Sequence, residues 1–410
     1  MCSYDCSGPP PPLRSDNDIN GIGVGLPASV IINYLATAGI AVLVILIYYF
    51  AVYEPALDAF SKLEHGVTPT PFRPNPVDVV LLQWVRYLPR KILGTFKLGI
   101  RNPARLDSTF IKCFLAMSDL QIVTGFSILI SGFAQFPCGL ATYYWMLIVE
   151  MAWFSSLTHL SCLTLLRSHL YNRTTERAWR LFAMGAMAGL LVIGLVFTGR
   201  YTWAYESAVF ETGISDDAIG PSPLDPAICY LDISAESTYA FWSMLFSVAL
   251  IIMAYVSRVI KLHRTLSIGF VGRVRSVVGI QLRKLLRIVH TWSNPKASPE
   301  SLSTLFCYRP LFASYLAFRA LLDGWTSMGV EVGWLLLAFG WGISRLMNTI
   351  NYQKYTPDLK IEDDDSGDWS FGQVVAMVLL AAPIITILEY FDHSMSPDIP
   401  LICPIVPLIC

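Results

Sequence analysis

The chain has 410 residues, of which 54% are hydrophobic and 14% charged, and its formal net charge is −1. A soluble domain usually carries about 25% charged residues, so the composition argues against an ordinary soluble domain. The near-zero net charge identifies no class of partner, because the two signs are segregated along the chain. Nine cysteines occur without a Cys-x-x-Cys pair, which argues against a metal ribbon or a thioredoxin-like site.

The first 29 residues precede the first long apolar run. They contain one basic residue, Arg14, so they lack the positive segment that opens a cleavable signal peptide. The run Pro9–Pro12 indicates a disordered tail. We expect residues 1–29 to form a disordered tail outside the cell.

Long apolar runs then predict membrane-spanning helices, since a helix needs about 20 apolar residues to cross the hydrocarbon layer. The last run contains Pro383, which would kink the helix but is tolerated in lipid. The clear runs are 30–53, 110–133, 142–166, 181–198, 239–260 and 372–391.

The segment 311–346 is apolar over 36 residues, which as one helix would be about 54 Å long and too long for one span. Its first half contains Arg319 and Asp323. We interpret 311–323 as a helix lying in the interface and 330–346 as the sixth span. The alternative is a hairpin of two short spans. The predicted fold is thus an all-α, polytopic transmembrane bundle of about seven spans in 30–391, with amphipathic interfacial helices in its cytosolic loops.

The distribution of basic residues predicts how the bundle sits in the membrane. Loops 54–109, 167–180 and 258–309 contain 22 of the 29 Lys and Arg residues. Loop 134–141 contains none, and loop 200–238 contains one against seven Asp and Glu. Because basic loops stay in the cytosol, we expect a multi-pass protein of the plasma membrane or an endomembrane, with its N-terminus outside. Seven spans would place the C-terminus in the cytosol.

This orientation makes two predictions about covalent chemistry. The sequon Asn172-Arg173-Thr174 falls in a cytosolic loop and should stay unmodified. Cys138 and Cys229 lie just before the third and fifth spans, on the oxidising side. They could form a disulfide between two outer loops or remain two thiols, and Cys2 and Cys6 offer a further pair.

Two cytosolic loops contain amphipathic segments. Residues 77–88 are mainly apolar and include Trp84. Residues 273–292 alternate apolar and basic side chains. The second pattern is typical of a helix on the anionic inner leaflet, although a helix packed under the bundle or a surface for a soluble partner is also compatible. Nucleic-acid binding is not expected against a bilayer. The basic residues are Arg273, Arg275, Arg283, Lys284 and Arg287.

Four polar residues of the second and third predicted spans are candidates for a functional site or a structural contact, because such groups are costly inside the membrane. Asp119 and Gln121 lie in the second span, and Glu150 and His159 in the third. Asp119 and His159 should lie at comparable depth, so a contact between them is geometrically possible. It would be either part of a proton-linked switch or polar cavity, or a hydrogen bond that only sets packing.

Small residues in the fourth span include Gly185 and Gly189 at Gly-x-x-x-Gly spacing. This spacing indicates close helix packing first, and helix-mediated dimerisation second. Of six histidines only His159 lies well inside a span, so no metal site is predicted. With no phosphate-binding or nucleophile motif either, we predict no cofactor and no catalytic residues.

Several short stretches together resemble a large, fungus-specific family of multi-pass membrane proteins that has no established biochemical role. The resemblance covers roughly 28–391 and implies a fungal source and a membrane location, but supplies no catalytic residues. Residues 394–410 depart from it. The stretches are Ser118-Asp119-Leu120-Gln121 with Thr124-Gly125, Ala152–Leu160, Arg309-Pro310-Leu311, Trp341-Gly342 and Trp369-Ser370-Phe371-Gly372-Gln373.

Three functions are compatible with this pattern. The span count, the external N-terminus and the basic cytosolic loops favour a seven-helix sensor or receptor-like protein, although the first cytosolic loop is long for that class. A proton-linked or small-solute transporter or channel would use Asp119, Gln121 and His159 to line a polar path. A non-catalytic scaffold would use the same residues for packing.

Overall fold

The computed structural model describes residues 6, 28–53, 55, 75–92, 103–166, 173–204, 223, 225–231, 238–263, 272–292, 306 and 308–355. Within these ranges the regular elements are helices, with an isolated bridge between Ala141 and Pro226. The described part of the chain therefore has the all-helical class that the apolar runs predict.

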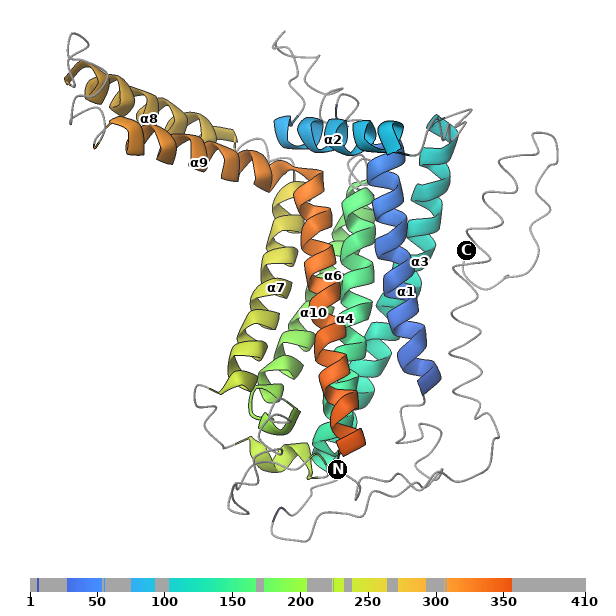
Figure 1. Cartoon of the computed structure of the whole chain (residues 1–410). Coiled ribbons are helices and arrows are strands. Elements are labelled where there is room, and N and C mark those ends of the chain that lie inside the picture. Colours follow the sequence, from blue (N-terminus) through green and yellow to red (C-terminus); the bar gives the residue numbers. More distant parts are fainter. Residues whose placement is uncertain are drawn as a thin grey trace, which may run out of the picture.

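A bundle of long helices runs along one common axis (Figure 1). In the described residues, six helices are long and apolar enough to cross a membrane, and they coincide with the first six predicted spans. The predicted seventh span, 372–391, lies outside the described residues. The six are α1 (Ala28–Ile47), α3 (Pro103–Gln135), α4 (Thr142–Leu165), α6 (Thr174–Thr198), α7 (Tyr239–Leu262) and α10 (Met328–Tyr355).

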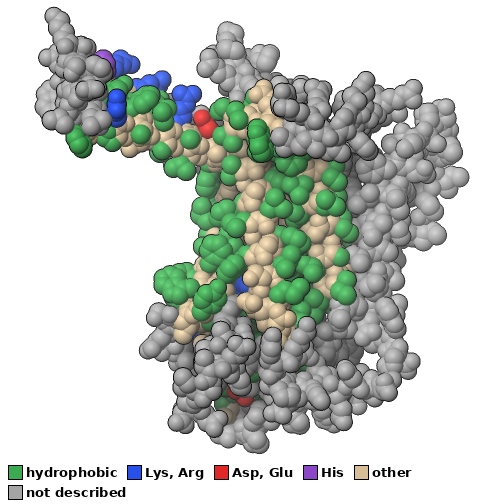
Figure 2. All heavy atoms as spheres, viewed as in Figure 1, with side chains coloured by type: hydrophobic (Ala, Val, Ile, Leu, Met, Phe, Trp, Pro, Cys, Tyr) green, Lys and Arg blue, Asp and Glu red, His purple; other side chains and the backbone are tan. Residues whose placement is uncertain are grey.

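Helix α4 is the centre of this bundle. Its most apolar stretch is 100% buried, whereas no more than half of that stretch is buried in any of the other five helices. Those helices turn large apolar side chains outward, including Leu43, Val123, Phe182 and Trp242, as Figure 2 shows for one face. An apolar exterior around a central helix rich in polar groups is the arrangement that a lipid environment favours.

Three further helices lie across one end of the bundle, at a large angle to its axis (Figure 1). They are α2 (Pro76–Ile92), α8 (Gly272–Trp292) and α9 (Arg309–Thr326). Ser327 between α9 and α10 has extended backbone (φ −69°, ψ 135°), so the chain turns there. The segment 311–346 is therefore one helix across the end plus one bundle helix, as interpreted above, rather than a hairpin of two spans.

We call the end that carries α2, α8 and α9 the basic end. At the opposite end, a disulfide joins Cys6 to Cys229 near the start of α4; we call this the disulfide end. Of the alternatives that the sequence leaves open, a disulfide between Cys138 and Cys229 is not formed. Cys138 keeps its thiol, 3.9 Å from the carbonyl oxygen of Ala134, and the N-terminal segment takes its place.

Two glycines allow close approach of bundle helices. A Cβ built on Gly342 of α10 would lie 2.6 Å from Nε1 of Trp153 in α4, and one built on Gly185 of α6 would lie 2.6 Å from the hydroxyl oxygen of Tyr255 in α7. Gly189 has nothing within 4 Å of its Cβ position. Of the Gly-x-x-x-Gly pair, Gly185 therefore serves packing within the chain.

Replacing Gly342 by Ala is expected to lower the free energy of unfolding by about 1–3 kcal/mol, the usual cost of overpacking. The indole of Trp153 cannot move away freely, because its Nε1 donates a hydrogen bond to the carbonyl oxygen of Ala338 (3.1 Å). Gly189→Ala is the matched control, and should be neutral or slightly stabilising because alanine favours the helix. Equal loss in both variants, measured by detergent-induced unfolding in bicelles, would contradict this packing.

Candidate functional site

Four polar clusters occupy the bundle, two on α4 and two at the basic end. The first, which we call the Glu150 cluster, joins α4 to α10 and α7. Oγ1 of Thr349 donates a hydrogen bond to Oε1 of Glu150 (2.8 Å), and Nη1 of Arg345 donates to Oγ of Ser247 (3.0 Å). Nε1 of Trp341 donates to the same serine oxygen (2.9 Å).

The Glu150 cluster is incompletely satisfied. Glu150 is 2% exposed, and its Oε2 has no hydrogen-bond partner among the described residues. Nε of Arg345 likewise has no hydrogen-bond partner among the described residues. A buried carboxylate and a buried guanidinium that attract one another without direct contact leave capacity for a proton, a water or a ligand.

The second, the His159 cluster, lies nearer the basic end. Nδ1 of His159 lies 2.6 Å from Oγ of Ser118 on α3, and Arg180 of α6 pairs with Asp119 through two nitrogens (2.6 and 3.0 Å). Nη1 of Arg180 also donates to Oγ of Ser118 (3.5 Å). That hydroxyl can therefore donate its own proton to Nδ1 of His159, which leaves the Nε2–H tautomer.

The contact between Asp119 and His159 that the sequence allows is not formed, and each residue has another partner. Asp119 is half exposed and binds Arg180, while the neighbouring Ser118 takes the histidine. Successive residues of a helix point about 100° apart, so only one of these two can face α4. Arg180, which lies just outside the run 181–198 used to predict the span, is the residue that sequence reasoning missed.

Gln121 is buried on α3, and its side-chain oxygen has no hydrogen-bond partner among the described residues. The main-chain carbonyl oxygen of Gln121 accepts a hydrogen bond from Oγ of Ser155 on α4. Gly125 allows α3 to approach both α4 and α6 closely, because a Cβ there would collide with Oγ of Ser155 in α4 and lie 2.8 Å from the sulfur of Met187 in α6. Gln121 thus lies at the α3–α4 contact, between the Glu150 and His159 clusters.

The third, the Glu331 cluster, joins α7 and α10 at the basic end. Glu331 accepts ion-paired hydrogen bonds from Arg258 and Lys261. The three side chains are 11%, 5% and 6% exposed. The sequence suggested no role for Glu331, since a carboxylate near a span end can reach water, but the structure buries it between two cations.

The fourth, the Asp78 hinge, fixes the turn between α9 and α10. Oδ1 of Asp78 on α2 accepts from Oγ of Ser327 (2.7 Å), the N–H of Gly329 (2.8 Å) and the hydroxyl of Tyr49 (3.0 Å). Oδ2 accepts from the N–H of Met328 (3.1 Å). A buried carboxylate from another helix therefore caps the N-terminus of α10, where the helix dipole favours negative charge.

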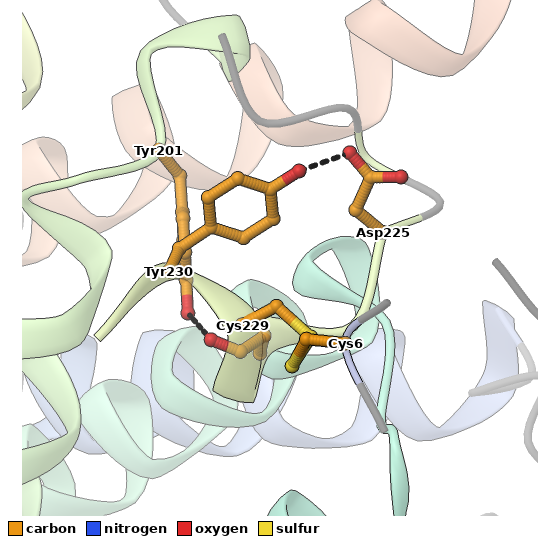
Figure 3. Close-up of a disulfide and its surroundings, with 6 residues drawn as sticks. Cys6, Tyr201, Asp225, Cys229 and Tyr230 are labelled. Carbon is orange, nitrogen blue, oxygen red and sulfur yellow. Dashed lines mark hydrogen bonds between the residues drawn. A yellow bond between two sulfur atoms is a disulfide. The ribbon is translucent and has the colours of Figure 1, made fainter. Parts of the chain in front are cut away.

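The start of α4 is covered at the disulfide end by residues 223–230. The N–H groups of Thr142 and Tyr143 donate to the carbonyl oxygens of Asp225 (2.9 Å) and Pro223 (3.1 Å). Figure 3 shows the disulfide beside this segment, with the Tyr230 hydroxyl donating to Asp225. Burial and the Asp225 contact raise the pKa of Tyr230 above its ordinary value, so this phenol remains a donor at neutral pH.

The disulfide gives a prediction that peptide mapping can check. Cys229→Ser should leave Cys6 alkylatable, and Cys138→Ser should leave the Cys6–Cys229 peptide intact, because Cys138 has no part in the bond. Mass spectrometry of the unreduced, alkylated protein measures both. A peptide joining Cys138 to Cys229 in the wild-type chain would contradict the pairing.

The basic segment forms α8. Arg283, Lys284 and Arg287 are exposed on it, while the side chains of Arg273 and Arg275 lie outside the described part. No group of three or more His, Cys, Asp or Glu is placed to hold a metal ion among the described residues. Comparison with protein-family models, curated proteins and solved structures finds no match. The apolar helices thus define a membrane protein, and its function must be argued from these clusters.

Proposed function

We propose that the chain is a seven-helix sensor or receptor-like membrane protein, with its disulfide end outside and its basic end in the cytosol. The orientation is supported by the 22 basic residues in loops 54–109, 167–180 and 258–309. It is also supported by the Cys6–Cys229 bond at the opposite end, since disulfides persist in oxidising compartments. The six apolar helices provide the membrane location.

The observation that carries the proposal is that α10 connects three of the polar clusters. Arg345 and Thr349 belong to the Glu150 cluster, Glu331 gives the Glu331 cluster its carboxylate, and Met328 and Gly329 belong to the Asp78 hinge. Fourteen residues separate Glu331 from Arg345, which is about 21 Å along a helix. A rigid helix of this length connects a buried charge site on the external side to a turn on the cytosolic side.

The proposed mechanism is a small shift of α10 against α4. A proton or ligand that removes the charge of Glu150 removes the attraction on Arg345, which then favours another set of partners. Helix shifts of about 1–2 Å are typical of such transitions. The far end of α10 is held by Asp78 and Glu331, so the shift would be transmitted to α9.

Glu150→Gln tests this coupling, because it removes the charge and keeps the shape. We expect faster hydrogen–deuterium exchange at residues 323–330, in the Asp78 hinge, with the fold retained. Glu176→Gln at the start of α6 is the control, since that carboxylate is 41% exposed and forms an ion pair with the neighbouring Arg173 (2.6 Å). Exchange that changes only around α4 and the nearby half of α10 would contradict the coupling.

A transporter or channel is the second candidate, and one observation favours it. Ser156 Oγ, His159 Nε2 and Gln121 Oε1 are buried without a hydrogen-bond partner among the described residues. They lie on or against α4, on the basic-end side of Glu150, and could line a polar path. Ion or proton flux in proteoliposomes that is abolished by His159→Ala or Asp119→Asn, in protein that still folds, would favour transport over sensing.

A further inference from the structure

Helices α8 and α9 form a hairpin that projects from the basic end of the bundle; we call residues 272–292 and 309–326 the arm (Figure 1). The two helices run side by side. The ring of His290 on α8 packs edge-on against the ring of Tyr308, which precedes α9, with 5.4 Å between the ring centroids. Leu286 is buried. The arm is joined to the bundle through α9, at the Asp78 hinge.

One side of the arm is apolar, and this side faces along the axis of the bundle, away from the basic end. Figure 2 shows apolar side chains along the underside of the arm and basic side chains along its upper side. Val277, Leu285 and Ile288 of α8 and Phe312 and Leu316 of α9 are exposed. At about 100° per residue, Val277, Leu285 and Ile288 fall within one quarter of the circumference of α8. The exposed residues Lys284 and Ile280 border this quarter.

The charge of the arm is strongly one-sided. Helix α8 contains five Lys or Arg and no Asp or Glu, and α9 adds two Arg and one Asp. Arg283, Lys284 and Arg287 are exposed on α8. Long basic side chains on the polar side of an amphipathic helix can reach lipid phosphates while the apolar side enters the interface.

The hinge fixes the level at which the arm lies. Nδ2 of Asn75, at the start of α2, donates to the carbonyl oxygen of Asp323 in α9 (2.7 Å). Asp78 then binds Ser327 and the first N–H groups of α10. Helices α2 and α9 are therefore tied to each other and to the end of a membrane-spanning helix, which places the arm at the membrane surface.

We propose that the arm is a lipid-binding surface that lies on an anionic membrane leaflet, with its apolar underside in the interface and its basic residues on headgroup phosphates. A membrane surface is a better partner for the arm than a soluble protein, because the exposed apolar side of the arm faces the membrane that the bundle crosses. This inference does not depend on the sensor mechanism. A failure of the Glu150 coupling would leave it intact.

The test is hydrogen–deuterium exchange of the full chain in nanodiscs of phosphatidylcholine alone or mixed with phosphatidylserine. We expect slower exchange in residues 277–292 when phosphatidylserine is present, and reversal of the effect by salt. Replacing Arg283, Lys284 and Arg287 together by Gln should shift the ratio of bound to released arm by about 100-fold toward release. Arg173→Gln, an exposed arginine outside the arm, should change nothing.

A second variant separates insertion from charge. Val277→Asn with Ile288→Asn should speed exchange of the arm in both lipid mixtures, because it removes apolar contact with the interface. Equal exchange of the wild-type arm in both lipid mixtures and in detergent would overturn the proposal. Protection that appears only when a soluble cytosolic fraction is added would also overturn it, and would assign the surface to a protein partner.

Discussion

Replacing Glu331 by Gln is expected to lower the free energy of unfolding by about 3–5 kcal/mol, the cost of leaving a buried charge without its counter-ion. The substitution leaves Arg258 and Lys261 side by side, 5% and 6% exposed, with no carboxylate between them. Their mutual repulsion should loosen the contact of α7 with α10 at the basic end. Detergent-induced unfolding in bicelles measures the loss.

A triple variant isolates the charge effect. Arg258→Met with Lys261→Met and Glu331→Met removes all three charges and keeps apolar volume at the α7–α10 contact. Replacing a whole buried ionic cluster by apolar residues is often neutral or stabilising, so this variant should unfold close to the wild-type chain. If Glu331→Gln alone costs nothing measurable, the carboxylate is hydrated and the cluster is not a buried ionic site.

Replacing Asp78 by Ala is expected to cost a similar amount, about 3 kcal/mol or more, because two buried and two partly buried donors lose this acceptor at once. The donors are the hydroxyls of Tyr49 and Ser327 and the N–H groups of Met328 and Gly329. The turn between α9 and α10 should then exchange its amide hydrogens faster. Unfolding in bicelles and exchange at 323–330 measure the two effects.

Asp78→Asn provides the graded comparison. It keeps the Oδ1 acceptor for three donors but places an NH₂ opposite the N–H of Met328, so we expect roughly 1 kcal/mol of loss. Glu176→Gln, whose carboxylate is 41% exposed, should lie within about 0.5 kcal/mol of wild type. The same loss for Asp78→Ala and Glu176→Gln would show that Asp78 does not cap α10.

The first six spans could be predicted from the sequence because a bilayer imposes a length on apolar helices that no soluble core imposes. The bend at Ser327 was also predictable, since Arg319 and Asp323 argued against a span over 311–323. The start of α6 was placed too late, at 181 rather than Thr174. Arg180 is tolerated inside that helix because Asp119 pairs with it, and such pairing depends on a neighbouring helix.

The polar clusters could be predicted only in part, because their contacts also depend on neighbouring helices. Composition showed that Asp119, Glu150 and His159 are costly in lipid, but their partners depend on which helices pack together. Glu331 was missed, although a signal existed. Arg258 and Lys261 are three residues apart, hence on one side of α7, and lie at the same end of their span as Glu331. Opposite charges at equal depth indicate a pair.

The disulfide could not be predicted, because the sequence offers several cysteines on one side of the membrane and no way to choose between them. Cys138 and Cys229 border successive outer loops, which made them the natural pair. The structure instead brings Cys6 to Cys229, beside the segment 223–230 that covers the start of α4. The position of Cys6 in the fold decides the pairing, and no local sequence pattern encodes that position.

Glycosylation mapping tests most directly that this chain is a membrane bundle with its disulfide end outside and its basic end in the cytosol. Gly213→Asn creates a sequon with Ile214 and Ser215 in the loop 200–238, and the natural sequon at Asn172 lies in the loop 167–180. Expressed in a eukaryotic cell, the variant should gain one glycan that an endoglycosidase removes, and the wild-type chain should carry none at Asn172. A glycan at Asn172, with none gained at position 213, would contradict the proposed orientation. Release of the unglycosylated chain from membranes by alkaline carbonate would contradict membrane insertion itself.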